Sequence, residues 1–184
     1  MNSKNNTKDL LADSLKELMV KKSFEKITIK QICDATGVIR IVFYNYFSDK
    51  YDALEYIVDR DLYETVLPYI KCKKREDAFK VMIYTIQENI DFYRAGYQII
   101  GQNSFEDAVY KAVGKIVSDF SKHIDTNLIS YDKFYKGTLL KFHTIMIAEG
   151  IKEYVLNDKE FDPLYLIELY RWLISSSEIL LEEK

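Results

Sequence analysis

Residues that form tight turns are scarce in this chain, and this scarcity constrains the fold more than any other feature. The 184 residues include only 6 Gly and 2 Pro, whereas a β-sandwich or β-barrel needs a turn about every 8–12 residues. Apolar residues instead recur at helical spacing, as Leu11, Leu15 and Met19 do near the N-terminus. The sequence therefore predicts an all-α fold.

The same periodicity predicts where the helices lie. We expect them over about residues 7–21, 28–35, 39–46, 50–69, 76–94, 95–102, 104–128, 132–156 and 163–182. Thr28 opens a capping box with the residue three positions on, Gly37 suits the left-handed end of a helix, and Asp162-Pro163 is a strong helix start. Pro68 and the basic stretch over residues 71–75 are expected to mark the end of the helix over 50–69 and a linker after it. These signals divide the chain into a small domain, residues 1–50, and a larger helical domain, residues 51–184.

Charge is distributed unevenly between these two domains. Residues 1–50 contain nine Lys or Arg and six Asp or Glu, a net charge of +3, whereas residues 51–184 carry a net charge of −6. A small basic head on an acidic body is typical of a protein whose head binds nucleic acid. A charge difference of this size also arises by chance, so the charge distribution alone does not decide whether the head binds nucleic acid.

Several classes of protein are disfavoured by what the sequence lacks. Cys33 and Cys72 make neither a disulfide framework nor a metal site, which favours a reduced, cytoplasmic protein. No apolar run approaches the roughly 18–20 residues of a membrane span, and the polar N-terminus lacks the apolar core of a signal peptide. His123 and His143 fall in no metal-binding spacing, and no nucleophile or phosphate-loop motif is present. We therefore expect no catalytic residues, no metal and no cofactor, and we place a helical enzyme last among the alternatives.

Two short helices joined by Thr36-Gly37-Val38 form the pattern of a helix-turn-helix. About eight residues on either side of a three-residue turn allow the second helix to enter a DNA major groove, which is about 12 Å wide. Any corner between two helices shares this spacing. The flanking residues must therefore decide the interpretation.

The flanking residues resemble the TetR family of bacterial transcriptional regulators over about 50 residues. The matching positions are Phe24, the Thr28-x-x-Gln-Ile run, Ala35-x-Gly-Val, Phe43-Tyr-x-x-Phe and Lys50-x-x-x-Leu. The stretch from residue 43 to residue 57 looks most like a branch that includes regulators of dihydroxyacetone kinase operons. The resemblance implies a homodimer, formed through the last two helices, that binds a near-palindromic operator in double-stranded DNA.

The expected DNA contacts lie in and beside the second helix of the motif. Phe43 and Phe47, one helical turn apart, should pack this helix onto the head. Arg40 is the expected base reader, because its planar guanidinium can bond guanine O6 and N7 together; a phosphate contact without base specificity is the alternative. Lys50 matches the family's phosphate-contacting lysine. The complete expected set is Thr28, Lys30, Arg40, Tyr44, Asn45, Tyr46 and Lys50.

The recognition helix departs from the family pattern at three positions. Ile39, Ile41 and Val42 are β-branched and apolar, where the family often has small polar or permissive residues. None of them can hydrogen-bond a base, although a contact with a thymine methyl is open to Ile41 or Val42. Two functions from different classes follow: a regulator that reads its operator partly through methyl groups and DNA shape, or a TetR-like interaction module that has lost or weakened DNA binding.

In the larger domain, the resemblance implies an aromatic-lined pocket for an effector. The sequence names no ligand, and the effector is either a small molecule or another protein. Repression is the commoner mode of regulation in the family, so a repressor is the expected sign.

Overall fold

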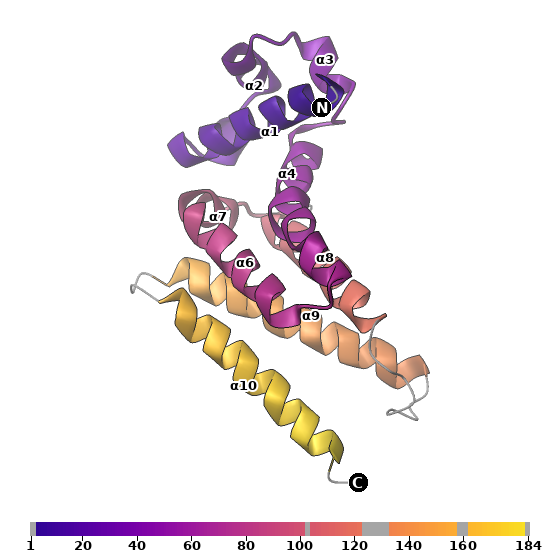
Figure 1. Ribbon diagram of the computed structural model, residues 1–184. Coiled ribbons are helices and arrows are strands. Elements are labelled where there is room, and N and C mark those ends of the chain that lie inside the picture. Colours follow the sequence, from indigo (N-terminus) through magenta and orange to yellow (C-terminus); the bar gives the residue numbers. More distant parts are fainter. Residues whose placement is uncertain (1–2, 102–103, 123–132, 158–161, 183–184) are drawn as a thin grey trace.

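The computed structural model describes residues 3–101, 104–122, 133–157 and 162–182, and every regular element in these ranges is a helix. A small head lies at one end of the molecule, and α10 extends toward the opposite end (Figure 1). The expected all-α class is therefore confirmed. None of the described helices is long and apolar enough to cross a membrane.

The elements follow one another in a simple order. In the head, which comprises α1 to α3, they are α1 (Ser3–Lys21), a 3-10 turn η1 (Phe24–Lys26), α2 (Ile29–Thr36) and α3 (Arg40–Tyr44). In the body they are α4 (Lys50–Asp59), a π-helical turn η2 (Arg60–Glu64), α5 (Thr65–Lys71), α6 (Arg75–Glu88), α7 (Ile90–Gly96), α8 (Phe105–Ser121), α9 (Lys133–Leu156) and α10 (Pro163–Glu182).

The helix ends that the sequence marks by local signals are found where they were predicted. The Thr28 hydroxyl accepts from the Gln31 amide, and the Gln31 side chain accepts from the Thr28 amide at 3.0 Å, which completes the capping box. Gly37 adopts the left-handed conformation with φ 69° and ends α2. Asp49 caps α4, and Asp162 accepts from the Leu164 amide at 2.9 Å to cap α10.

The head is held together by the aromatic pair that the sequence predicts. Phe43 and Phe47 are buried, with their ring centroids 5.5 Å apart, and Phe47 lies 5.5 Å from the Tyr56 ring on α4. Leu11 and Leu15 of α1 are fully buried beside them in the same core. This packing fixes α3 on the head and leaves its opposite face to solvent.

Pro68 lies inside the last turns of a helix, and the helical stretch expected over 50–69 ends at Lys71, close to its expected end. The chain remains helical from Lys50 through the π-helical turn to Lys71. Proline cannot donate the usual backbone hydrogen bond to the residue four positions earlier. The π turn, in which the Thr65 amide bonds the Arg60 carbonyl, already changes the hydrogen-bond register just before Pro68, so the missing amide bends the path less than it would in a regular α-helix.

The helix predicted over 76–94 is divided in two, and the one predicted over 95–102 does not form. Asn89, with φ −118° and ψ 25°, leaves the helical region and separates α6 from α7. α7 ends at Gly96, where an added Cβ would lie 2.4 Å from the Phe105 ring. The close approach of Phe105 thus requires glycine there. The helix predicted over 104–128 forms over Phe105–Ser121 and ends there with its C-cap at Lys122, earlier than predicted; residues 123–128 of the prediction lie outside the described residues.

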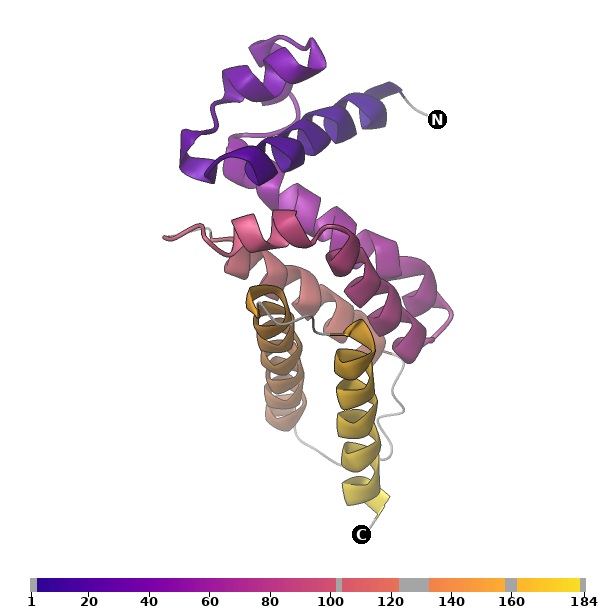
Figure 2. The same ribbon diagram turned by 90° about the vertical axis from the view of Figure 1, so that its left-hand side faces the viewer.

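Within the body, α8 packs against α9 and α4, while α10 packs mainly against α6. Phe79 of α6 and Tyr170 of α10 stack with ring centroids 3.9 Å apart. Figure 2 shows α9 and α10 at the end of the body away from the head, with α9 running toward the head and α10 running away from it. Consequently the last two helices form the end of the molecule opposite the head.

Candidate nucleic-acid interface and body pocket

The recognition helix α3 turns its polar and its unusual apolar residues to solvent. Arg40 and Asn45 are exposed, as is Tyr44 with 57% of its surface accessible. Ile39 and Ile41 are 66% and 71% exposed. Since neither isoleucine contributes to the core of the head, both apolar side chains are available to an outside partner.

The N-terminus of α2 presents two more of the expected residues. Thr28 and Lys30 are both exposed, and the Thr28 hydroxyl is already used in the capping box. Tyr46, by contrast, is half-buried and packs against the core of the head. The small domain thus exposes five of the seven expected residues, namely Thr28, Lys30, Arg40, Tyr44 and Asn45. Their contacts with DNA stay a prediction.

Lys50 has a second role that the sequence does not reveal. Its ammonium donates to the carbonyls of Phe24, Glu25 and Ile27 at 2.8, 3.2 and 3.1 Å, and it lies 4.5 Å from the centroid of the Phe24 ring. Burial lowers the pKa of this ammonium. Lys50 therefore ties the start of α4 to the turn before α2 in the free protein, and its predicted phosphate contact is untested.

An ion-pair network joins α1 of the head to the π-helical turn of the body. Arg60 donates to Asp9 at 3.2 Å and to Asp13 at 2.6 Å, while Lys16 lies 2.5 Å from Asp61. The Lys16 and Asp61 side chains are only 17% and 8% exposed. The sequence analysis did not predict these ion pairs between the head and the body. The sequence indicates only that the charged residues 9, 13 and 16 share one face of a helix.

A second set of polar contacts joins α4 and its π-helical extension to α8. The Tyr63 hydroxyl donates to Asp119 at 2.6 Å, and this bond raises the pKa of Tyr63 to about 12. Lys111 bonds Glu55 at 2.9 Å. α8 is thus attached to the same continuous helix that carries the ion pairs to the head.

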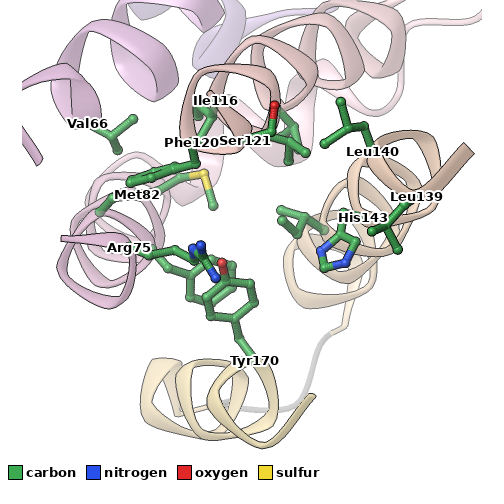
Figure 3. Close-up of a pocket in the computed structure, with 15 residues that line it drawn as sticks. Val66, Arg75, Met82, Ile116, Phe120, Ser121, Leu139, Leu140, His143 and Tyr170 are labelled. Carbon is green, nitrogen blue, oxygen red and sulfur yellow. The ribbon is translucent and has the colours of Figure 1, made fainter. Parts of the chain in front are cut away.

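A pocket lies on the other side of α8, between α5, α6, α8, α9 and α10. It encloses about 90 Å³. Among the described residues that line it, most are aliphatic, and Phe79, Phe120 and Tyr170 are aromatic. The aromatic-lined effector pocket stays a prediction. Figure 3 shows Arg75 and His143 on facing sides of the space.

The polar groups of this pocket are few and all non-acidic. They belong to Arg75, Ser121, His143 and Tyr170. Burial lowers the pKa of His143, and the positive charge of Arg75 lowers it further. Burial raises the pKa of Tyr170 to about 12. The pocket is therefore an apolar space with positive character at one wall.

The last two helices carry large apolar side chains that the described residues leave exposed. Phe142 on α9 and Trp172 on α10 are 65% and 64% exposed. The other exposed apolar residues on these helices are Leu139, Ile145, Leu156, Leu164, Tyr165 and Leu169. Large exposed apolar side chains that gather on two helices are a common mark of an interaction surface.

Comparison with known proteins defines the class. Residues 73–176 match the family described as a TetR-type transcriptional regulator C-terminal region. Because this match covers more than half of the chain, the protein belongs to the TetR family of transcriptional regulators, as the sequence resemblance implied.

Two relatives specify the branch. The HTH-type dhaKLM operon transcriptional activator DhaS of Lactococcus lactis subsp. lactis (strain IL1403) is 20% identical over 163 residues, which are 86% of this chain and 84% of that protein. A solved structure of the dihydroxyacetone kinase operon activator DhaS matches with a TM-score of 0.67 at 18% identity and covers 96% of both chains. The resemblance to the dihydroxyacetone kinase operon branch and the all-α TetR-like fold are thus confirmed.

Proposed function

We propose that this protein is a homodimeric, cytoplasmic regulator that binds a near-palindromic DNA operator and responds to an effector bound in its body. The observation that carries the proposal is the recognition helix. Its aromatic anchors are buried, while Arg40, Ile41 and Tyr44 are turned outward from a head of net positive charge. Such a surface matches a major groove, which offers hydrogen-bond acceptors and thymine methyl groups to a helix.

The residues of the head have distinct roles in this proposal. Arg40 reads guanine, and Ile41 contacts a thymine methyl. Thr28 and Lys30 bind phosphate at the N-terminus of α2, while Tyr44 and Asn45 donate to backbone phosphates that fix the register. Tyr46 and Lys50 complete the set beside the recognition helix, with Lys50 also supporting the turn before α2.

Dimerisation through α9 and α10 sets the distance between two heads. The exposed apolar residues of these helices, such as Phe142 and Leu169, would be covered by the same surface of a second copy. A two-fold dimer places its recognition helices in major grooves about one helical turn apart, or a multiple of it. The operator is therefore expected to be a near-palindrome.

The polar contacts described above connect the pocket to the head. An effector between α6, α8 and α9 displaces α8, whose bonds from Lys111 and Asp119 act on the helix formed by α4 and η2. That helix holds α1 through Arg60 and Asp61. Differential binding of the effector to two head spacings would then change DNA affinity.

Separate observations support repression and activation as the mode of regulation. Repression is the commoner mode in the family, and it is the sign expected from the sequence. Both DhaS relatives are named activators of an operon, which favours activation in this branch. Expression of a reporter gene placed behind the operator, measured with and without the protein, distinguishes repression from activation.

A second candidate function is an interaction module that no longer binds DNA. The exposed Ile39 and Ile41 favour it, because apolar side chains on a recognition helix also suit a protein partner. This candidate predicts no sequence-specific binding even at low salt.

The experiment that tests the proposal is selection from a random duplex-DNA pool by the purified protein, with Arg40→Ala alongside. We expect an enriched near-palindrome for the wild type and a blurred preference at one position of each half-site for the variant. No enrichment by folded, dimeric protein, with and without candidate ligands of the body pocket, would contradict the proposal and favour the interaction module.

A further inference from the structure

Among the residues whose side chains the structure describes, none forms a hydrogen bond or ion pair with the guanidinium of Arg75 at the wall of the body pocket. Arg75 is half-buried at the start of α6. Its neighbours on α6 and α10 are paired differently: Glu76 holds Arg171 at 2.6 Å and Lys80 at 2.7 Å. The carboxylate nearest in sequence is thus occupied by other cations.

None of the described residues that line the pocket neutralises this charge. No Asp or Glu is found among the fifteen residues that line it. His143 faces the space from α9, and its proximity to Arg75 disfavours a second positive charge there. A partly desolvated cation without a counter-charge is unfavourable, so an anion entering the pocket would bind where the protein has left its charge uncompensated.

The rest of the lining selects against a small, fully hydrated anion. Val66, Met82, Ile116, Leu140 and Ile147 surround the space with aliphatic side chains. Such walls stabilise an apolar chain by about 0.8 kcal/mol for each CH₂ group that they remove from water. The ligand must therefore combine an anionic head with an apolar tail.

The form of the head and the length of the tail follow from geometry. A planar guanidinium pairs with a carboxylate through two parallel hydrogen bonds. The volume of about 90 Å³ is smaller than the roughly 150 Å³ of an apolar cavity that holds benzene. This space suits a short, flexible chain better than a ring.

We propose that the body pocket binds an aliphatic monocarboxylate of about four to six carbon atoms, with its carboxylate on Arg75 and its chain between α6, α8 and α9. The Tyr170 hydroxyl, which donates to none of the described residues, lies beside Arg75, and the His143 imidazole faces them across the pocket (Figure 3). This assignment rests on the proposed function, because it names the chemical class of the effector.

The test is isothermal titration calorimetry of the full-length protein at pH 7.5 with acetate, butyrate, hexanoate, octanoate and hexan-1-ol. We expect hexanoate to bind, acetate to give no detectable heat, and hexan-1-ol to bind at least tenfold more weakly than hexanoate. Hexanoate should also shift the His143 ring-proton resonance, which is assigned with His143→Gln. Binding by none of the carboxylates, or equal affinity for hexanoate and hexan-1-ol, would overturn the proposal.

Variants at neighbouring positions separate a specific contact from general charge. Arg75→Met removes the guanidinium and keeps an unbranched chain, and we expect at least a tenfold loss of hexanoate affinity. Lys74→Met makes the same change of charge at the adjacent exposed residue, outside the pocket, and should stay within twofold of wild type. Equal losses in the two variants would contradict the assignment, provided that circular dichroism shows both to be folded.

The ligand proposal and the proposed function can be contradicted independently of each other. Calorimetry measures the pocket without DNA, whereas DNA selection measures the head without a ligand. Enriched DNA without carboxylate binding would overturn the ligand class alone. Carboxylate binding by a protein that selects no DNA would overturn the regulator and leave the pocket assignment in place.

Discussion

The recognition helix and the last two helices both expose large apolar side chains, yet their surroundings differ. Ile39 and Ile41 flank Arg40 on a head of net positive charge, whereas Phe142 and Trp172 belong to a body of net negative charge. An apolar residue next to a cation suits a DNA groove, in which methyl groups and acceptors alternate. Apolar residues continued along two neighbouring helices suit a second copy of the chain. Exposure alone therefore does not identify a partner; the neighbouring charge and the extent of the surface do.

The largest expected effect concerns the surface of α9 and α10. The double variant Phe142→Glu with Leu169→Glu places charge where an apolar dimer interface is proposed, and it should raise the dimer dissociation constant at least a hundredfold, about 3 kcal/mol. Sedimentation equilibrium measures this directly. Tyr84→Glu, which changes an exposed aromatic residue on α6, is the matched control and should leave the dimer intact. A double variant as dimeric as the control would place the interface elsewhere.

Variants of Arg40 and Lys30 test the DNA-binding surface of the head. Arg40→Ala should cost about 1–3 kcal/mol on the selected operator and relax the preference at one position. Lys30→Ala, which is proposed to lose a phosphate contact, should weaken binding uniformly and reduce the salt slope by about one. Fluorescence anisotropy over a range of salt concentrations separates these patterns. If Arg40→Ala weakens all sequences equally, its assignment changes to a phosphate contact.

Lys50 is expected to affect both the fold and the interface. Lys50→Met leaves three carbonyls without their charged donor, so the free energy of unfolding should fall by about 1–2 kcal/mol. The predicted phosphate contact adds a reduction of the salt slope by about one. Urea unfolding and DNA titration measure the two effects, with the exposed Lys30→Met as the stability control. A normal salt slope in a destabilised variant would remove Lys50 from the DNA-contacting set.

The smallest expected effect tests the apolar reader. Replacing thymine by uracil in the operator removes only a methyl group, and the wild type should lose about 0.5–1 kcal/mol at the position that Ile41 contacts. Ile41→Ala should bind weakly and be insensitive to that replacement. Equal sensitivity in both proteins would show that the methyl group meets a different residue.

The parts of the fold that were predicted correctly depend on local signals. The capping box at Thr28, the left-handed Gly37 and the buried pair Phe43 and Phe47 each involve residues a few positions apart. The stripe along α4, including Leu54 and the residues that follow it at helical spacing, is buried as the pattern indicates. Hydrogen bonds and packing within one or two turns are encoded in such neighbours.

The parts that were missed depend on residues distant in the sequence. Lys50 bonds carbonyls more than twenty positions earlier, and Arg60 pairs with α1 almost fifty positions earlier. The need for glycine at position 96 follows from the ring of Phe105, which is not adjacent in sequence. In the sequence, Arg75 belongs to a basic stretch that was expected to be a linker. It becomes a pocket residue only through the packing of α9 and α10, which are distant in sequence. Tertiary contacts, rather than local preference, decide all of these features.

The most direct measurement compares DNA affinity for two versions of the selected operator that differ by five inserted base pairs between the half-sites. Half a helical turn moves one half-site to the opposite face of the duplex. If the last two helices join two reading heads at a set spacing, affinity should fall at least tenfold on insertion, and the monomeric Phe142→Glu, Leu169→Glu variant should bind both versions equally. Unchanged affinity of the wild type would contradict a dimer whose body sets the distance between its heads.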